Sequence, residues 1–283
     1  MTNSFAYPPA SDGKPFRLNM GLRELDTTYW LEGGPDLNDQ LKERARILAD
    51  NRDQVFQDEL GHEGGVKYFT EQLVKNLKKH HNDYQVNGTT IKHSPTGIEV
   101  DLEKDHPFVQ LAKVIAEDLC LLYSDNGKWR LVTAVVIFPS RWNLLEKIGK
   151  SIDDIHIPVP GYDQALKPFM GDTFNKVRSD RPVWRKNWSL HETSILHEPF
   201  YVGKSAQVEE YWWRTERQTL TASADQKYLL FTIRNRSEPF NWIKSDPQTA
   251  QQFAKTLATL PPEMLAYKHL VEKRDALINY LNQ

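Results

Sequence analysis

A histidine in a short apolar segment stiffened by prolines is the best candidate in this chain for binding a metal-containing cofactor. His156 lies in the segment Ile155–Tyr162, which reads Ile-His-Ile-Pro-Val-Pro-Gly-Tyr, and it follows the pair Arg141 and Trp142. Proline fixes the backbone angle φ, so the imidazole is carried by a stiff chain. A neutral imidazole held in this way is a common axial ligand of haem iron. Arg141 could pair with haem propionates and Trp142 could contact the ring face. The alternative is an ordinary histidine of the hydrophobic core.

Charged residues also interrupt two late segments that otherwise have the pattern of half-buried strands. They are Arg214, Glu216, Arg217 and Arg234. Burying a charge is costly unless it is paired within the protein or meets a ligand. One interpretation is an internal network of Glu–Arg ion pairs. The other is the polar floor of a pocket, in which the arginines bind carboxylates and Glu216 binds a cation.

The other motifs exclude several kinds of site. No glycine-rich nucleotide-binding fingerprint or phosphate loop is present, which argues against a flavin or nicotinamide site of the usual kind. Cys120 is the only cysteine, so the chain cannot supply a four-cysteine iron–sulfur site, and its leucine neighbours predict a buried, inert thiol. His191-Glu192 and His197-Glu198 form a denser cluster that is either a metal site or an exposed loop.

The composition fits a globular protein rather than a nucleic-acid or membrane binder. The 283 residues are 39% hydrophobic and 26% charged, and the formal net charge is −2. A charge this close to zero favours neither nucleic acid nor an anionic membrane as a partner. The first residues lack the apolar stretch of a secretory signal, and the run Ala134–Phe138 is too short to cross a bilayer. We therefore expect a cytoplasmic protein.

Periodicity predicts helices at both ends of the chain and strands between them. Helical spacing is expected at 38–60, 65–80, 106–119, 142–150, 246–260 and 262–282. Extended chain is expected at 83–101, 210–220 and 228–235, and as a hairpin of 119–123 with 129–138 around Asn126-Gly127. This order indicates an α+β fold with a mainly antiparallel sheet. We expect a flexible N-terminal segment at 1–15 and a single domain at 16–283.

Several segments, in order, resemble those of a known family. They are Phe138-Pro139-Ser140-Arg141-Trp142, Lys147-Ile148-Gly149-Lys150, Ile155 to Tyr162, Asn187-Trp188-Ser189, Thr215 to Leu220 and Phe231-Thr232-Ile233-Arg234. In these segments the chain is similar to the haem-dependent oxidative N-demethylase alpha-subunit family, from about residue 16 to about residue 270.

The resemblance implies a PAS-like domain that holds haem b through a histidine. It also implies oxidative demethylation of a small secondary amine, dimethylamine, by O2, with methylamine and formaldehyde as products. Electrons would come from NADPH through partner subunits that carry flavin and an iron–sulfur centre. On the matching positions of this chain, His156 becomes the iron ligand, and Arg141 and Trp142 contact the edge of the haem.

The resemblance also assigns roles to the charged strand residues. Glu216 and Arg217 become candidates for catalysis in the distal pocket, and Arg234 for binding the propionates. The chain departs from the family pattern at 221–225, where relatives usually have a turn with arginine and proline, and this departure bears on the substrate. Two alternatives remain open, a haem-binding PAS-like gas or redox sensor and a haem-free scaffold.

Overall fold

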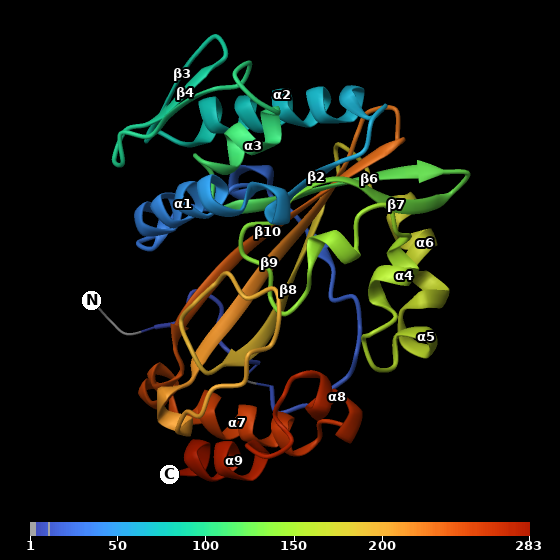
Figure 1. The fold of residues 1–283 in the computed structure, drawn as a ribbon. Helices are drawn as coiled ribbons and strands as arrows, with labels where there is room; N and C mark the ends of the chain where they lie inside the picture. The colour runs from blue at the N-terminus through green and yellow to red at the C-terminus, as the bar shows by residue number, and fades with distance from the viewer. Residues whose placement is uncertain (1–3, 11) are drawn as a thin grey trace.

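A long, twisted antiparallel sheet runs through the middle of the molecule and is flanked by helices at both ends (Figure 1). This arrangement comes from a computed structural model, which describes residues 4–10 and 12–283. Within those residues the large sheet has the strand order β1-β8-β9-β10-β6-β7-β2, and a small sheet has the order β3-β4-β5. The mixed helix and sheet composition with antiparallel strands confirms the α+β part of the expected fold.

The elements have the following bounds. The strands are β1 (Arg23–Glu24), β2 (Phe56–Asp58), β3 (Tyr84–Asn87), β4 (Thr90–His93), β5 (Glu99–Asp101), β6 (Glu117–Asp125), β7 (Lys128–Val135), β8 (Val183–His191), β9 (Trp212–Ala222) and β10 (Tyr228–Pro239). The helices are α1 (Leu37–Val55), α2 (Glu63–His80), α3 (Pro107–Ala112), α4 (Ile152–His156), α5 (Tyr162–Ala165), α6 (Lys167–Lys176), α7 (Pro247–Ala258), α8 (Pro262–Tyr267) and α9 (Arg274–Asn282).

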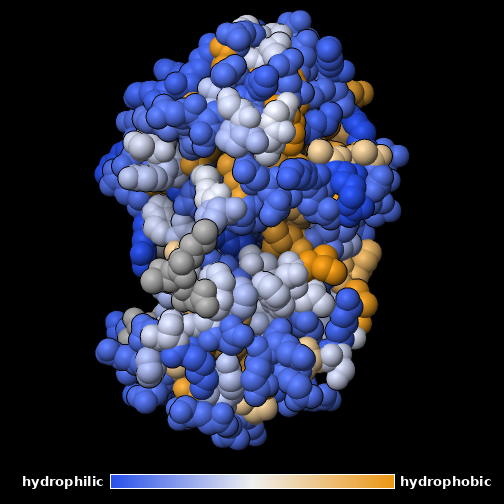
Figure 2. Space-filling model, turned by 90° about the vertical axis from the view of Figure 1, so that its left-hand side faces the viewer, coloured by the Kyte–Doolittle hydropathy of each residue, from blue (hydrophilic) through white to orange (hydrophobic). Residues whose placement is uncertain are grey.

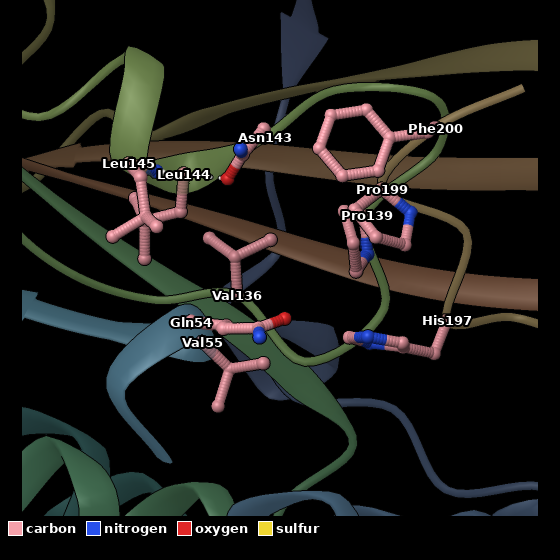
Figure 3. Close-up of a pocket in the computed structure, with 10 residues that line it drawn as sticks. All are labelled: Gln54, Val55, Val136, Pro139, Asn143, Leu144, Leu145, His197, Pro199 and Phe200. Atoms are coloured by element: carbon pink, nitrogen blue, oxygen red, sulfur yellow. Dashed lines mark hydrogen bonds between the residues drawn. The ribbon is translucent and has the colours of Figure 1, made fainter. Parts of the chain in front are cut away.

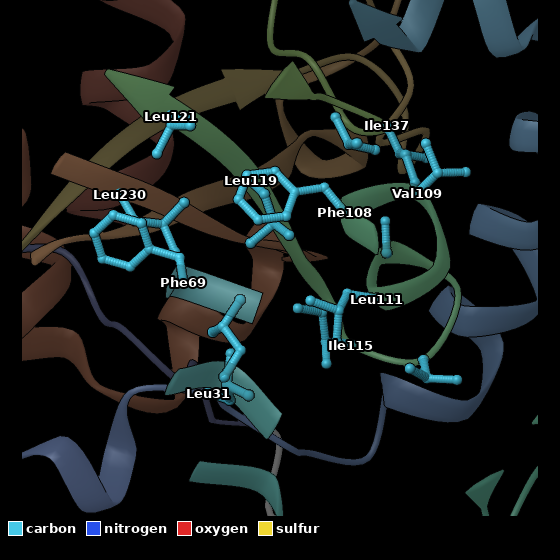
Figure 4. Close-up of a cluster of buried hydrophobic side chains, with 14 of the residues drawn as sticks. Leu31, Phe69, Phe108, Val109, Leu111, Ile115, Leu119, Leu121, Ile137 and Leu230 are labelled. Carbon is cyan, nitrogen blue, oxygen red and sulfur yellow. The ribbon is translucent and has the colours of Figure 1, made fainter. Parts of the chain in front are cut away.

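Three hydrophobic clusters hold these elements together. The first packs α1, α2 and α3 on one face of the sheet through residues such as Phe69, Phe108 and Leu119 (Figure 4). The second joins the lower ends of β8 and β9 to α7, α8 and α9. The third packs α4, α5 and α6 on the opposite face of the sheet from the first. The left-hand side of the molecule is hydrophilic over most of its surface, with hydrophobic side chains mainly around its middle (Figure 2).

The predicted hairpin is confirmed. Strands β6 and β7 pair around Asn126 and Gly127, both of which have positive φ, as a tight hairpin turn requires. The two late strands are also present as β9 and β10, and they pair over their whole length.

Four predicted helices are shorter than expected. The helix expected at 38–60 ends at Val55, because Phe56–Asp58 pairs with β7 as β2. The helix expected at 106–119 ends at Ala112, and the chain then enters β6. The segment 142–150 contains only a short 3-10 turn at Leu144–Glu146. The last predicted helix is divided into α8 and α9 by a turn in which His269 has positive φ.

The N-terminal residues that the structure describes contact the sheet. The Phe5 ring lies 6.1 Å from the Trp213 ring, and Trp213 Nε1 donates to the Tyr7 carbonyl at 2.8 Å. Lys186 Nζ donates to the Pro8 carbonyl at 3.1 Å. The division into a flexible segment 1–15 and a domain 16–283 stays a prediction, and residues 1–3 and 11 lie outside the described residues.

Candidate functional site

His156 lies in the last turn of α4, and its ring is fixed by a bond to the backbone. Ser151 caps the start of this helix, since its Oγ accepts from the Asp154 amide at 3.1 Å. His156 Nδ1 lies 2.7 Å from the carbonyl oxygen of Ile152. Because a carbonyl can only accept, Nδ1 carries the proton and Nε2 keeps its lone pair. This tautomer suits coordination of a metal through Nε2.

The surroundings of His156 favour the neutral imidazole. The ring stacks on the Tyr162 ring, with 5.4 Å between centroids and 17° between planes, and Tyr162 donates to Asp153. Burial lowers the pKa of His156, the Ile152 carbonyl opposes that shift, and the positive charge of Arg185 adds to it. Near pH 7 the side chain is therefore an uncharged nitrogen ligand.

Strands β8 and β9 present a row of polar side chains on the face of the sheet that α4 to α6 cover. Arg185 pairs with Gln218, Asn187 with Glu216 and Ser189 with Arg214, so these six residues share one face. The same alternation places Val183 and Leu220 in the hydrophobic cluster of α4 to α6. His156 and Glu216 therefore belong to the same side of the sheet.

Glu216 is a half-buried carboxylate at the centre of this polar row. Its Oε2 accepts from Gln218 Nε2 at 2.9 Å and from Asn187 Nδ2 at 3.5 Å. Burial lowers the pKa of Lys268 to about 8, and the charge of Glu216 limits that fall. Glu216 thus places a half-buried carboxylate close to the buried ammonium group of Lys268, and such a carboxylate suits a cationic ligand.

Two arginines of the same row have nitrogen atoms without a hydrogen-bond partner among the described residues. They are Nε of Arg185 and both Nε and Nη1 of Arg214. Arg214 is only 1% exposed and uses Nη2 alone, which donates to the Phe138 carbonyl at 2.7 Å and to Asn235 at 3.0 Å. Burial lowers the pKa of Arg214 to about 10. Buried guanidinium donors of this kind fit an anionic group such as a carboxylate.

Arg141 belongs to an ion-paired cluster with His191 and two glutamates, which adjoins the polar row at Ser189. Its Nε donates to Glu198 and its Nη2 to Glu192, both at 3.0 Å. The same Glu198 lies 2.6 Å from His191 Nδ1, and Ser189 Oγ lies 2.8 Å from His191 Nε2. The cluster starts at the end of β8 and continues into the loop that follows. The expected loop is present, but the charged side chains of the cluster are largely buried rather than exposed. In the part of the chain that the structure describes, no group of three or more His, Cys, Asp or Glu is arranged to hold a metal ion.

Arg217 and Arg234 lie on the face of the sheet opposite to Glu216 and are cross-strand neighbours. Arg217 Nε pairs with Glu32 at 3.0 Å, and Arg234 Nη2 pairs with Asp36 at 2.9 Å. These two arginines therefore fix the segment before α1 to the sheet. The structure does not bring them together with His156, and the interpretation as internal ion pairs describes them better than a pocket floor.

Two cavities lie elsewhere in the molecule. One, of about 220 Å³, is formed mainly by apolar side chains, with His197 at its edge (Figure 3). His197 Nδ1 is bonded to the Ile137 carbonyl at 2.7 Å. The other, of about 330 Å³, lies between α2, β6 and the segment before α1. Neither cavity is lined by His156 or Glu216.

His156 and residues on the same side of the sheet fit a haem group by their chemistry. His156 offers a neutral nitrogen ligand, and Trp142, Ile155 and Val159 are partly buried apolar neighbours in the same cluster. The unpaired donors of Arg185 and Arg214 suit the two carboxylates of haem.

The sequence analysis did not predict strand β8, and it therefore missed the polar face formed by Arg185, Asn187 and Ser189. The alternation of polar 185, 187 and 189 with Trp184 and Trp188 was the available signal.

A comparison with protein families agrees with the resemblance noted in the sequence. Residues 21–278 match the model of a family described as haem-dependent oxidative N-demethylase, alpha subunit-like. The match covers most of the chain, including α4 with His156 and the polar row of β8 and β9. The chain therefore belongs to the haem-dependent oxidative N-demethylase, alpha subunit-like family.

Proposed function

We propose that this protein is the haem-binding subunit of an oxidative N-demethylase that acts on a small secondary amine such as dimethylamine. The reaction consumes the amine, O2 and two electrons with two protons, and it gives methylamine, formaldehyde and water. The electrons come from NADPH through partner subunits that carry flavin and an iron–sulfur centre. The PAS-like class of the domain, haem b as the bound form and a cytoplasmic location are parts of the same proposal.

The proposal rests on the tautomer and the charge of the His156 imidazole. Its Nδ1 is committed to the Ile152 carbonyl, while burial keeps the ring neutral and leaves Nε2 free to coordinate. The residue lies inside the matched region, on the side of the sheet that carries Glu216. When bound, haem supplies oxygen activation at its iron.

The side chains around His156 take complementary roles in this proposal. Glu216 accepts hydrogen bonds from Gln218 and Asn187, which fix its carboxylate and keep it available to an ammonium group. Such an ion pair would orient the amine for reaction. Arg185 and Arg214 use their orphaned donors for the haem carboxylates, and Trp142 packs on the apolar part of the ring. Arg141 positions the His191 and Glu198 pair, and its contact with the edge of the haem stays a prediction.

Absorption spectroscopy of the purified protein tests the proposal. We expect a stoichiometric Soret band that shifts when carbon monoxide is added to the reduced protein, and shifts again with dimethylamine. The variant His156→Ala should lose haem, whereas His80→Ala at the end of α2 should keep it. A His156→Ala protein with an unchanged haem spectrum would remove the ligand assignment.

The amine part of the proposal has its own readout. Glu216→Gln should keep haem and weaken the dimethylamine-induced shift at least tenfold, while Glu103→Gln on an exposed loop should leave it unchanged. A haem spectrum that ignores amines in the wild-type protein would instead favour a gas or redox sensor. A protein that takes up no haem would support neither function.

A further inference from the structure

The larger of the two cavities described above lies on the face of the sheet opposite to Glu216. It has a volume of about 330 Å³ and is bounded by the C-terminal end of α2, the start of β6 and the segment before α1. Glu117 faces Arg234 across β6 and β10, and Arg234 faces Arg217 across β10 and β9, so all three lie on this side. The cavity is therefore separated from the proposed haem site by the sheet itself.

Three side chains of this cavity have buried polar atoms without a hydrogen-bond partner among the described residues. They are Oε2 of Glu117, Oε2 of Glu32 and Nε2 of His81. Glu117 is only 1% exposed, and its other oxygen accepts from the Glu32 amide at 2.8 Å. Glu32 Oε2 is 3.6 Å from Arg236, too far for a hydrogen bond. Buried polar atoms are almost always paired, and a carboxylate oxygen can only accept, so the two unpaired oxygens indicate a missing donor.

The cavity is lined by acidic groups and, among the described residues, by no lysine or arginine. The carboxyl groups of its lining are Glu32, Asp83 and Glu117. The guanidinium groups facing them are Arg217, Arg234 and Arg236. Burial raises the pKa of Glu117, and a nearby cation would restore its ionised form.

The remaining wall of the cavity is apolar. It consists of Leu31, Leu37, Leu77, Ile115 and Ala116. An inorganic cation would leave this wall without a partner, whereas an alkyl chain would cover it. The ligand should therefore combine N–H donors at one end with a short hydrocarbon chain at the other.

We propose that this cavity binds a small primary or secondary alkylammonium ion. Its N–H groups donate to the orphaned oxygens of Glu117 and Glu32 and to the free ring nitrogen of His81, and its alkyl chain packs on the leucines. The site is additional to the proposed demethylation site, and the two can be occupied independently because they lie on opposite faces of the sheet.

Isothermal titration calorimetry with n-butylammonium chloride tests the site on the protein as purified. We expect Glu117→Gln to weaken binding at least tenfold, because the amide removes the charge and presents a donor where the ligand also donates. Glu103→Gln, which removes a carboxylate on an exposed turn outside the cavity lining, serves as the matched control and should leave this binding unchanged. Tetramethylammonium, which has the charge without N–H groups, should bind at least tenfold more weakly than n-butylammonium.

A second variant keeps the test decisive if Glu117→Gln does not fold. His81→Ala removes one orphaned nitrogen outside the ion-paired network and should weaken binding two- to fivefold. The proposal is overturned if the wild-type protein binds no n-butylammonium, which would mean that the cavity holds only water. It is also overturned if Glu117→Gln binds n-butylammonium as tightly as the wild-type protein does, or if tetramethylammonium binds equally well.

Discussion

At the scale of single residues, burial favours the neutral form of His156 and of His191. His156 has its proton fixed on Nδ1 by the Ile152 carbonyl, and burial lowers its pKa. His191 is only 1% exposed, and burial lowers its pKa to about 4, with the nearby charges of Arg214 and Arg141 adding to the effect. The Glu198 carboxylate opposes that shift and is not strong enough to reverse it. Protonation of either ring is therefore linked to the stability of the fold.

The pH dependence of stability should report on His191. An unfolded histidine binds a proton near pH 6.5, whereas folded His191 binds one only near pH 4. The unfolded state thus holds more protons between these values, and stability falls as the pH falls. Between pH 7.5 and pH 5 this residue should contribute about 2 kcal/mol to the loss in free energy of unfolding. Urea denaturation of the wild-type protein and His191→Gln should show a smaller loss in the variant. Equal losses in both proteins would contradict the assigned pKa.

At the scale of elements, one buried ion pair joins α1 to the sheet. Arg44 of α1 is fully buried, and its Nη1 donates to Asp118 Oδ1 of β6 at 2.8 Å. The Arg44 guanidinium also donates to the backbone carbonyls of Ala112, Ala116 and Glu117. Asp118 in turn accepts from the amides at 137 and 138, where the chain leaves β7. The pair thus fixes α1, β6 and the segment that leads to Arg141.

Removing one partner of this pair should be strongly destabilising. Arg44→Met leaves Asp118 buried without its cation, and we expect a loss of about 3–5 kcal/mol in the free energy of unfolding. The matched control is Arg46→Met in the same helix, which breaks exposed ion pairs with Glu43 and Asp50 and should cost less than about 1 kcal/mol. Denaturant titration of both variants gives the comparison. Similar losses for the two variants would show that burial does not decide the strength of the pair.

At the scale of the whole molecule, the described residues of the N-terminus bind to the sheet that carries the candidate site. Tyr7 donates to Glu32, which also pairs with Arg217 of β9. Trp213 Nε1 has the Tyr7 carbonyl as its partner. Stability is therefore expected to depend on contacts between distant parts of the chain.

Among the described helices, none has the length and apolar character that a membrane span requires.

Deleting residues 1–8 should destabilise the whole protein. The deletion exposes part of the Trp213 ring and leaves its buried Nε1 without a partner, so we expect a loss of about 2–4 kcal/mol. Lys14→Ala, which breaks only an exposed contact with Asp12, should leave the melting temperature nearly unchanged. Differential scanning calorimetry distinguishes the two. A truncated protein that melts like the full chain would support the expected flexible segment at 1–15.

Much of the fold could be predicted from local patterns. The Asn126-Gly127 turn and the apolar run before Pro139 indicated the central hairpin, and the alternation after Tyr211 indicated β9. Strand β8 was missed because its polar and aromatic residues lack the β-branched pattern of the other strands. The end of α1 was misplaced because Phe56 suits a helix by spacing, and only its pairing with Val135 makes it a strand residue. The two residues of such a pair lie far apart in the sequence.

The amino-acid sequence is sufficient to recognise the family, the α+β class and the central antiparallel strands, and it predicts His156 as the iron ligand. Only the tertiary structure decided which charged residues share a site. Glu216 and Arg217 are neighbours in the chain, yet adjacent residues of a strand point to opposite faces, and different segments cover the two faces. Glu216 thus lies on the side of α4, while Arg217 pairs with Glu32. Successive side chains of a strand point alternately to the two faces of the sheet, whereas long-range packing decides which segments each face contacts.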